Sequence, residues 1–400
     1  MEKPVAAIEF SSKSLKLAVG YELDGKVYVL YALNKPYGHS IEAGSIVDQT
    51  AIASSVASIK QLVDSSVKLK ISISEALLAL PPYGLEVFQT KQVTTVISDE
   101  SKIGNLDIRN IYALIRNGAN PLQNELIDVA PERYILDQGR MFANPPIGES
   151  STTLTVQGKV HTLPKRIADD YQNTLLKGGV NVKRSIVAPF AACELLGTYD
   201  DIPRDYILVD VGSNMTTVSL VGEKALYASR FFEWGGDRIT DRIIEKFNIN
   251  EAEAEKIKCT YGLDKREMNF KAPVCTSDDG NGHEIKHYND ELNNIIKTEL
   301  EVFTKELNSA MDNLLEGYDK SYHGLPLILI GGGSMLNGFK DYLEPKVPNE
   351  TVKVVVPRSL GARNPAFLNC LGMILASAKY PSIYDETHPR VSPVTRDGEQ

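Results

Sequence analysis

The feature that most constrains the fold of this 400-residue chain is a pattern that occurs twice, about half a chain apart. In the first copy, the apolar strand Val5–Ile8 ends on Glu9, and a polar turn and a returning strand follow. In the second copy, Tyr206–Val209 ends on Asp210 and is continued in the same way. Repeated units of this kind predict two similar lobes that face one another. Two β-meanders that are alike by coincidence are the alternative.

The acid at each strand end suggests a metal–phosphate site. Asp210 is followed by the small and hydroxylated residues of Gly212–Thr217. Backbone amides of such a turn can point at phosphate oxygens, and the carboxylate can reach the hydrated Mg²⁺ that neutralises them. An ordinary hairpin carries similar residues, so this stretch alone favours a structural role.

Two glycine-rich turns strengthen the nucleotide interpretation. Gly235 and Gly236 precede a predicted helix, whose first backbone amides can cradle a phosphate. Alternatively, the glycines only make a turn, and Asp237 or Thr240 caps the helix. The triple glycine 331–333 follows a continuous apolar strand, and only glycine lets the backbone approach a flat base or a phosphate closely.

One charged pair on a predicted helix can contact a ribose. Glu255 and Lys258 lie three residues apart in Glu251–Tyr261, so they are neighbours on one helix face. A solvated ion pair would have the same spacing, and the pair alone favours that simpler interpretation.

Composition excludes several classes of protein. A chain of 400 residues exceeds a usual single core, so two or more domains are expected. The net charge of −9, with no basic block, argues against a nucleic-acid partner. The early strand predicts that there is no signal peptide, and no apolar run is long enough to span a bilayer. The four cysteines lie far apart and are predicted to be buried apolar residues of a reducing cytoplasm: Cys193, Cys259, Cys275 and Cys370.

A stretch of different character, roughly Gly84–Lys165, interrupts the first lobe. A helix is expected at Leu106–Arg116, so the stretch predicts a small inserted α+β unit. Its strands are expected near residues 87–93, Glu132–Leu136 and Thr152–Val160. Two helices rich in small residues, within Ser185–Leu196 and at Pro365–Tyr380, suit connectors between the lobes, because small side chains permit close helix approach. Ordinary core helices would look the same.

Together these pieces resemble the five nucleotide motifs of the actin superfamily, and within it the chain resembles the bacterial division protein FtsA over roughly residues 1–380. The most FtsA-like motifs are Gly44–Asp48, Asn144–Gly148, Trp234–Thr240 with Glu253–Lys258, and Gly331–Gly338. The resemblance implies an α/β, two-lobed actin-like fold made of duplicated ribonuclease-H-like domains, with an FtsA-type α+β subdomain inserted. That insertion favours FtsA over the filament formers MreB and ParM, whereas the pilus-assembly protein PilM has the same architecture and is the nearest competitor.

The resemblance also implies how the chain divides into domains. The first-lobe core would comprise residues 1–83, 166–197 and 365–385, with the inserted subdomain at 84–165. The second-lobe core would comprise 198–247 and 323–364, with an outer subdomain at 248–322. Residues 386–400 would be a disordered polar tail.

The implied ATP site draws on five segments. The first phosphate loop would supply Glu9, Ser11, Ser12, Ser14 and Lys16, and the second Asp210, Gly212, Ser213, Asn214 and Thr216. Gly235 and Gly236 would face the phosphates, Glu255 and Lys258 the ribose, and Gly331, Gly332, Gly333 and Met335 the adenosine. Asp210 and Glu9 would hold Mg²⁺ through water, and Asp210 is the candidate for positioning a reacting water.

Three departures from the pattern bear on catalysis. The first loop has Glu9 and a bulky turn where Asp-x-Gly is usual, and the second lacks a glycine pair and has Met215 where threonine is common. The first connector has Ala188 before Pro189 where MreB-like relatives carry a glutamate. Without a group that orients the attacking water, phosphoryl transfer loses alignment of its nucleophile. We therefore expect ATP binding with slow or absent hydrolysis.

The resemblance implies a cytoplasmic protein on the inner face of the cell membrane at the division septum. It would polymerise, tether the FtsZ ring and recruit further divisome proteins through residues 84–165. The FtsZ tail would dock on residues 248–322, where Tyr288–Glu291 replaces the paired arginines of the family and Lys286 and Lys297 remain nearby. A kinase or phosphatase would need a further catalytic carboxylate, and no candidate is found.

The end of the chain differs from the FtsA pattern of a linker and an amphipathic membrane helix. Pro381–Gln400 is rich in proline and charge and shows no apolar periodicity. Either the helix has been removed or the protein reaches the membrane through a partner. The alternative function is a PilM-like scaffold of a pilus or secretion assembly that binds a membrane-protein peptide.

Overall fold

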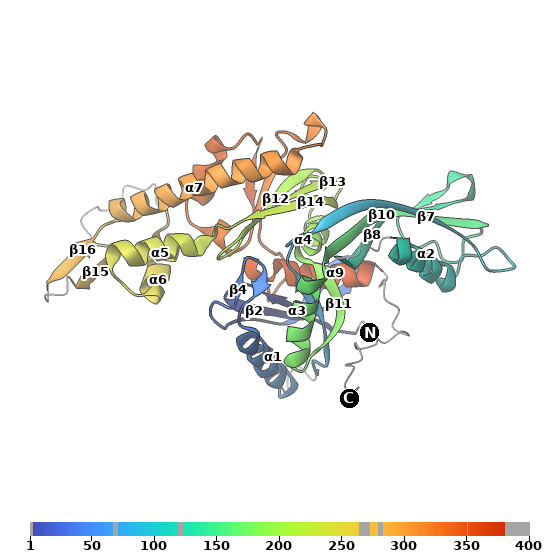
Figure 1. The fold of residues 1–400 in the computed structure, drawn as a ribbon, viewed down its shortest axis with the longest axis horizontal. Helices are drawn as coiled ribbons and strands as arrows, with labels where there is room; N and C mark the ends of the chain where they lie inside the picture. The colour runs from blue at the N-terminus through green and yellow to red at the C-terminus, as the bar shows by residue number, and fades with distance from the viewer. Residues whose placement is uncertain are drawn as a thin grey trace, which may run out of the picture.

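The computed structural model describes residues 3–66, 71–118, 124–263, 273–278, 283–349 and 351–380. Two lobes lie one above the other in Figure 1, and an inserted unit extends to one side. The tail Pro381–Gln400, for which we predicted disorder at residues 386–400, lies outside the described residues.

The first lobe is built on a five-stranded sheet in the order β11-β6-β1-β2-β3. Strands β1, β2 and β3 form an antiparallel meander, and β6 and β11 continue the sheet in parallel. The strands are β1 (Val5–Phe10), β2 (Ser14–Leu23), β3 (Lys26–Pro36), β6 (Glu75–Leu80) and β11 (Asn181–Val187). Helices α1 (Gln49–Asp64) and α3 (Lys165–Lys177) pack on this lobe, and a short ribbon joins β4 (Ile41–Glu42) and β5 (Ser45–Ile46).

The second lobe repeats this sheet strand for strand, in the order β18-β17-β12-β13-β14. Here β12, β13 and β14 form the antiparallel meander, and β17 and β18 lie parallel to β12. The strands are β12 (Tyr206–Val211), β13 (Thr216–Gly222), β14 (Ala225–Phe232), β17 (Leu327–Ile330) and β18 (Val352–Val354). Order and direction agree in both lobes, so the predicted duplication is confirmed.

The two acids occupy the same register position in the two meanders. Glu9 faces Lys16 across the β1–β2 ladder, and Asp210 faces Thr217 across the β12–β13 ladder. Each acid lies one residue before the last residue of its strand. The duplication therefore brings two carboxylates to matching edges of the two sheets.

The predicted insertion forms a sheet of its own, in the order β7-β10-β8-β9. Its elements are β7 (Glu86–Thr95), α2 (Asn105–Gly118), β8 (Asn124–Leu136), β9 (Met141–Phe142) and β10 (Thr153–Pro164). One face of α2, including Ile108, Ile111 and Ile115, packs in a core separate from those of the lobes. The inserted α+β unit is thus present, although β8 begins well before the predicted residue 132.

Two helices, α4 (Ala188–Leu196) and α9 (Leu368–Lys379), pass between the lobes (Figure 1). They pack so closely that a Cβ atom added to Gly372 would lie 1.9 Å from the Ala191 carbonyl oxygen. The apolar core of the first lobe continues past these helices to Tyr206 and Leu208 on one face of β12, while Val209 belongs to the second core. A sheet covered on both faces explains why its central strands are continuously apolar.

The remaining α-helices of the described residues belong to the second lobe, and residues of all four pack in its core. They are α5 (Gly236–Phe247), α6 (Glu251–Tyr261), α7 (Asn289–Leu315) and α8 (Phe339–Leu343), with the ribbon β15 (Cys275–Asp278) and β16 (Glu284–His287). Short 3-10 segments lie at Asp137–Gly139, Lys320–Tyr322, Gly332–Met335, Glu344–Lys346 and Pro365–Phe367. In the described residues, no helix is both long and apolar enough to cross a membrane.

The prediction for the cysteines was only partly right. Cys193 and Cys370 are buried, Cys275 is half-buried and Cys259 is exposed. Cys259 lies on the outer face of α6, where its thiol donates to the Glu255 carboxylate at 3.3 Å.

Candidate functional site

The two strand-end acids meet a lysine and an asparagine at the base of a cavity between the lobes. The Nζ of Lys16 lies 3.3 Å from Oε2 of Glu9, and Asn369 of α9 donates its amide to Oε1 of Glu9 at 3.0 Å. Asp210 lines the same cavity from β12. Both lobes and one connector helix therefore contribute to a single polar cluster.

This cluster carries more negative than positive charge. Burial raises the pKa of Asp210 to about 6; Glu9 adds to this effect, and Lys16 opposes it. Burial lowers the pKa of Lys16, but attraction to Glu9 and Asp210 outweighs it and the pKa is raised. Two carboxylates thus share one ammonium, an arrangement that an added cation would stabilise.

The cavity has an empty volume of about 990 Å³, including space open to solvent. Residues from both predicted phosphate loops line it: Glu9, Ser11, Ser12, Lys16, Asp210, Gly212, Ser213 and Asn214. The remaining predicted residues lie outside its wall.

Two predicted hydroxyl residues have local partners instead. The Ser11 and Ser14 hydroxyls lie 3.0 Å apart, and Ser11 also donates to the Ser14 carbonyl at 2.9 Å, so they stabilise the β1–β2 turn. Thr216 is fully buried and donates to the Trp234 carbonyl at 2.7 Å. Its role in the structure is to fasten β13 to the segment that leads into α5.

The start of α5 is docked on the second loop. The amide of Gly236 donates to the Gly212 carbonyl at 3.0 Å, and the amide of Asp237 donates to the Ser213 carbonyl at 2.9 Å. A Cβ atom on Gly235 would lie 2.1 Å from the Ser213 carbonyl oxygen, so glycine is required there for the contact. These two amides already have partners, and neither Asp237 nor any other side chain caps the helix.

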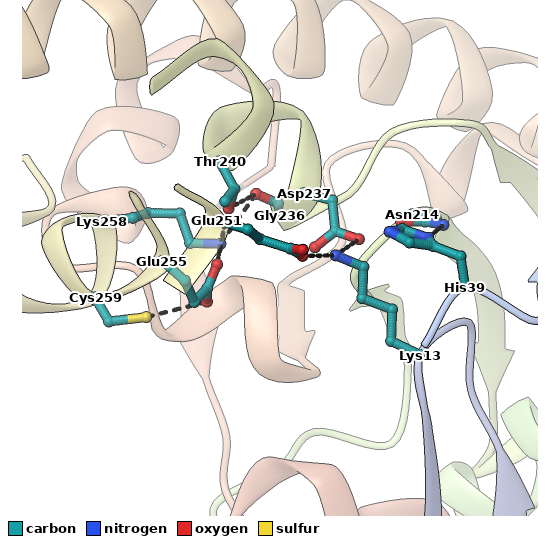
Figure 2. Close-up of polar contacts among 10 residues, drawn as sticks. All are labelled: Lys13, His39, Asn214, Gly236, Asp237, Thr240, Glu251, Glu255, Lys258 and Cys259. Atoms are coloured by element: carbon teal, nitrogen blue, oxygen red, sulfur yellow. Dashed lines mark hydrogen bonds and ion pairs between the residues drawn. The ribbon is translucent and has the colours of Figure 1, made fainter. Parts of the chain in front are cut away.

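The predicted ribose residues form a partly buried network between α5 and α6 (Figure 2). Lys258 donates to the Gly236 carbonyl at 3.1 Å and to the Thr240 hydroxyl at 2.8 Å, and it pairs with Glu255 at 2.6 Å. The Lys258 side chain is only 10% exposed. The lysine end of the pair is therefore buried and holds the first turn of α5, whereas the Glu255 side chain is 48% exposed.

The triple glycine lies against the end of β12. Gly331 has a φ of +83°, and a Cβ atom there would lie 2.3 Å from Oδ1 of Asp210. Gly333 is 4.0 Å from the Cβ position of Gly236, whereas Gly332 faces open space. Met335 follows with a half-exposed side chain. Glycine at 331 thus lets the backbone pass close to Asp210, and Gly332 and Met335 leave an open, partly apolar edge that suits a flat base.

Sequence reasoning missed two residues of the site. Lys13, inside the first predicted loop, forms ion pairs with Asp237 and Glu251 of the second lobe. Asn369 lies 360 positions from Glu9. The neighbouring serines were a signal for Lys13, but no sequence pattern indicated Asn369.

The comparisons with known proteins agree with this geometry. A family model described as cell division protein FtsA matches residues 207–372, which include Asp210, α5, α6 and the triple glycine. A relative from Enterococcus faecalis named cell division protein FtsA is 24% identical over 383 residues, covering 94% of this chain and 84% of that protein. One of the same name from Streptococcus pneumoniae is 25% identical over 368 residues, covering 92% and 78%.

The predicted resemblance to FtsA is confirmed. Solved structures show that the shared fold is actin-like. The structure titled PilM-PilN type IV pilus biogenesis complex has a TM-score of 0.61 at 18% identity, covering 93% of this chain and 97% of that one. MreB 5 of Spiroplasma citri, bound to AMPPNP, has a TM-score of 0.51 at 14% identity, covering 94% and 96%.

The residues present fit a magnesium nucleotide of the kind that an actin-like fold implies. Among the described residues, the buried Oε2 of Glu9 has the ion pair with Lys16 as its only polar contact, and the buried Oδ1 of Asn369 has no hydrogen-bond partner. Nowhere in that part of the chain do three or more His, Cys, Asp or Glu side chains form a metal site by themselves. Mg²⁺ keeps several waters and takes the rest of its ligands from carboxylates and phosphates, which agrees with a site of only two acids.

Proposed function

We propose that this chain is an ATP-binding, actin-like protein of bacterial cell division, similar in role to FtsA. It polymerises, tethers the FtsZ ring to the inner face of the cytoplasmic membrane and recruits further divisome proteins. The relatives named cell division protein support the role in division. The actin-like fold supports nucleotide binding.

One observation carries the nucleotide part of the proposal. Glu9 and Asp210 lie at equivalent register positions of a duplicated sheet and line one cavity. In this proposal Lys16 neutralises phosphate charge, and Glu255 and Lys258 hold the ribose. Bound Mg²⁺ would shield the phosphate oxygens from the two acids. Isothermal titration of the protein with Mg-ATP tests this, and absence of binding would count against it.

ATP hydrolysis is proposed to be slow. Ala188 and Pro189 line the cavity at the first connector, and neither side chain can orient a water. Glu233 also lines the cavity and is the remaining carboxylate in its described wall. A steady-state phosphate-release assay should show little turnover. Brisk turnover that Glu233→Gln abolishes would replace this proposal with Glu233 as the group that orients water.

The FtsZ tail is proposed to dock on the outer subdomain, residues 248–322. Lys286 of β16 is exposed and offers a positive charge to an acidic peptide, and Lys297 lies on α7. Fluorescence titration with an FtsZ tail peptide should show binding that Lys286→Glu weakens, because like charges repel across the interface. Lys26→Glu on the first lobe is the matched control. An unchanged affinity in the Lys286 variant would move the docking site elsewhere.

Filament formation and membrane contact are tested together. Co-sedimentation is measured with and without ATP, FtsZ and lipid vesicles. Pelleting with ATP alone would support self-assembly, and pelleting with vesicles only when FtsZ or another partner is present would support indirect membrane contact. A protein that remains in the supernatant under every condition would contradict both.

A further inference from the structure

One lysine of the first lobe, next to Ser12 in the cavity wall, contacts both α5 and α6 of the second lobe. Lys13 projects from the β1–β2 turn of the first lobe, and its Nζ lies 2.9 Å from Oδ2 of Asp237 and 2.8 Å from Oε1 of Glu251. Asp237 is in the first turn of α5 and Glu251 is the first residue of α6. Figure 2 shows the lysine reaching between these two carboxylates.

This contact is more than an exposed surface pair. The Asp237 side chain is 13% exposed, and its Oδ2 has no hydrogen-bond partner in the described residues apart from the ion pair with Lys13. Removal of the ammonium would leave a largely buried carboxylate oxygen without compensation, which is costlier than losing a solvated pair. Glu251 is the outer partner, with a side chain 62% exposed.

The turn that carries Lys13 is firmly held in the first lobe. The carbonyl of Lys13 accepts the amide of Tyr37 at 2.8 Å, and the carbonyl of Ser12 accepts the amide of Ser40 at 3.0 Å. From the same segment, His39 approaches the Asn214 amide of the second loop to 3.5 Å. Because this turn is fixed to the first lobe, the Lys13 ion pairs connect the first lobe to α5 and α6 of the second lobe.

The lobes are joined in two different ways. Beside the connectors α4 and α9, one apolar core runs from the first lobe to Tyr206 and Leu208 of β12, so the lobes cannot separate there without disrupting that core. At the α5 and α6 edge, the Lys13 ion pairs can break and reform. A hinge and a breakable contact on separate elements form the arrangement expected of a cleft that opens and closes.

We propose that Lys13, Asp237 and Glu251 form an ionic latch that holds the cleft closed and must open for nucleotide to enter or leave. The inference rests on the proposed nucleotide binding. The latch lies on the side of the predicted ribose residues. Gly236 is the neighbour of Asp237 in the chain, and a Cβ atom placed on Gly236 would lie 3.5 Å from the Lys258 amine. Nucleotide exchange would then be limited by the latch, whereas affinity would depend mainly on the cavity.

The first measurement needs no nucleotide. Cysteines for spin labels are introduced at exposed Leu62 of α1 in the first lobe and exposed Lys340 of α8 in the second. Cys259→Ser and Cys275→Ser remove the accessible native thiols. Pulsed electron paramagnetic resonance then measures the distance between the two labels. Lys13→Met should lengthen or broaden the distribution. A Lys13→Glu, Glu251→Lys exchange should restore part of the closed distribution, and Lys26→Met on the exposed start of β3 is the control. An unchanged distribution in Lys13→Met overturns the latch.

The second measurement is stopped-flow exchange of a fluorescent ATP analogue. Lys13→Met should accelerate association and dissociation by about fivefold, the ratio given by about 1 kcal/mol of lost interaction. Affinity should change by less than this, since both rates move together. Glu251→Gln should act in the same direction but more weakly, because Asp237 still holds the lysine.

The variants also separate a latch from a phosphate-binding lysine. A phosphate-binding Lys13 would lose affinity in Lys13→Met and gain it in Glu251→Gln, which frees the ammonium, and that pattern would overturn the proposal. If the unmodified protein binds no nucleotide, the proposed function fails, while the distance measurement still decides whether the latch exists.

Discussion

At the scale of single residues, substitution of Asp210 should have opposite effects on the stability of the protein and on ligand binding. Its folded pKa of about 6 lies above its ordinary value of 3.8, so the fold disfavours the ionised form. The contribution of protonated Asp210 to the free energy of unfolding is fully present below pH 4 and is lost as the pH rises through about 6. Asp210→Asn should therefore stabilise the protein at pH 7.5 by up to about 3 kcal/mol, with little effect at pH 4. Urea midpoints at both pH values measure this, and an equal effect at both would contradict it.

The same substitution should have the opposite effect on ligand binding. If Asp210 holds Mg²⁺ through water, Asp210→Asn and Asp210→Ala should weaken Mg-ATP binding by about tenfold or more, the range expected for loss of an outer-shell partner of a metal. Binding should also weaken as pH falls below about 6, because the carboxylate becomes protonated. Calorimetry with Asp24→Asn, an exposed turn position, as control checks both effects. Unchanged affinity would count against the assignment.

Residues fixed by local pattern were predictable, and residues fixed by the meeting of lobes were not. Glu9 and Asp210 follow from a strand that ends on an acid, a signal contained within a few residues. Asn369 and the partners of Lys13 depend on how α9, α5 and α6 lie against the first lobe. No spacing rule contains that information, because long-range placement is set by packing of the whole chain.

At the scale of elements, the close packing of α4 and α9 should determine whether replacing Gly372 by alanine stabilises or destabilises the protein. Gly→Ala within a helix normally stabilises by about 0.5–1 kcal/mol. At Gly372 the new methyl carbon would lie 1.9 Å from the Ala191 carbonyl oxygen, and backbone cannot move aside cheaply. Gly372→Ala should therefore destabilise by about 1–3 kcal/mol, as overpacking does.

The control for this prediction lies in the same helix. Ala378 is exposed next to the last residue of α9, so Ala378→Gly reports helix propensity without packing and should cost at most about 1 kcal/mol. Thermal unfolding of both variants compares the two effects. A stabilised Gly372→Ala protein would show that the two connectors separate more easily than their packing indicates.

The boundary of β8 was hard to predict because this strand contains a proline and a bulge. The predicted strand at residue 132 is the second part of β8, which begins at Asn124 and contains Pro131. Proline is unusual in a central strand because it cannot donate to the ladder. Here Gly158 pairs with Pro131 and the preceding Gln157 pairs with Arg133, so Glu132 is left over in a bulge. The bulge accommodates the proline, so the strand extends to Asn124, beyond the predicted start at residue 132.

At the scale of the whole molecule, one buried ion pair joins three parts of the chain. Arg184 of β11 donates to Asp128 of β8 at 2.6 Å and to the carbonyl of Tyr380, after α9, at 2.7 Å. The first lobe, the insertion and the end of the second connector are thus held together at a point without solvent: the Asp128 side chain is fully buried. The insertion is therefore expected to move with the first lobe and not as a separate appendage.

This junction predicts strong coupling between its two charges. Arg184→Met or Asp128→Leu alone should cost about 3–5 kcal/mol, because each leaves a buried charge unpaired, whereas the double variant should cost less than their sum and can approach the unmodified protein. Lys183→Met is the control: it removes a partly exposed pair with Glu75 and should cost at most about 1 kcal/mol. Denaturant midpoints of the two single variants and the double variant give the coupling free energy of the pair. Hydrogen exchange of the β8 and β11 amides shows whether the two strands loosen together. Additive losses, or loosening of β8 alone, would mean that the insertion is held by its apolar contacts and that the ion pair does not couple it to the lobe.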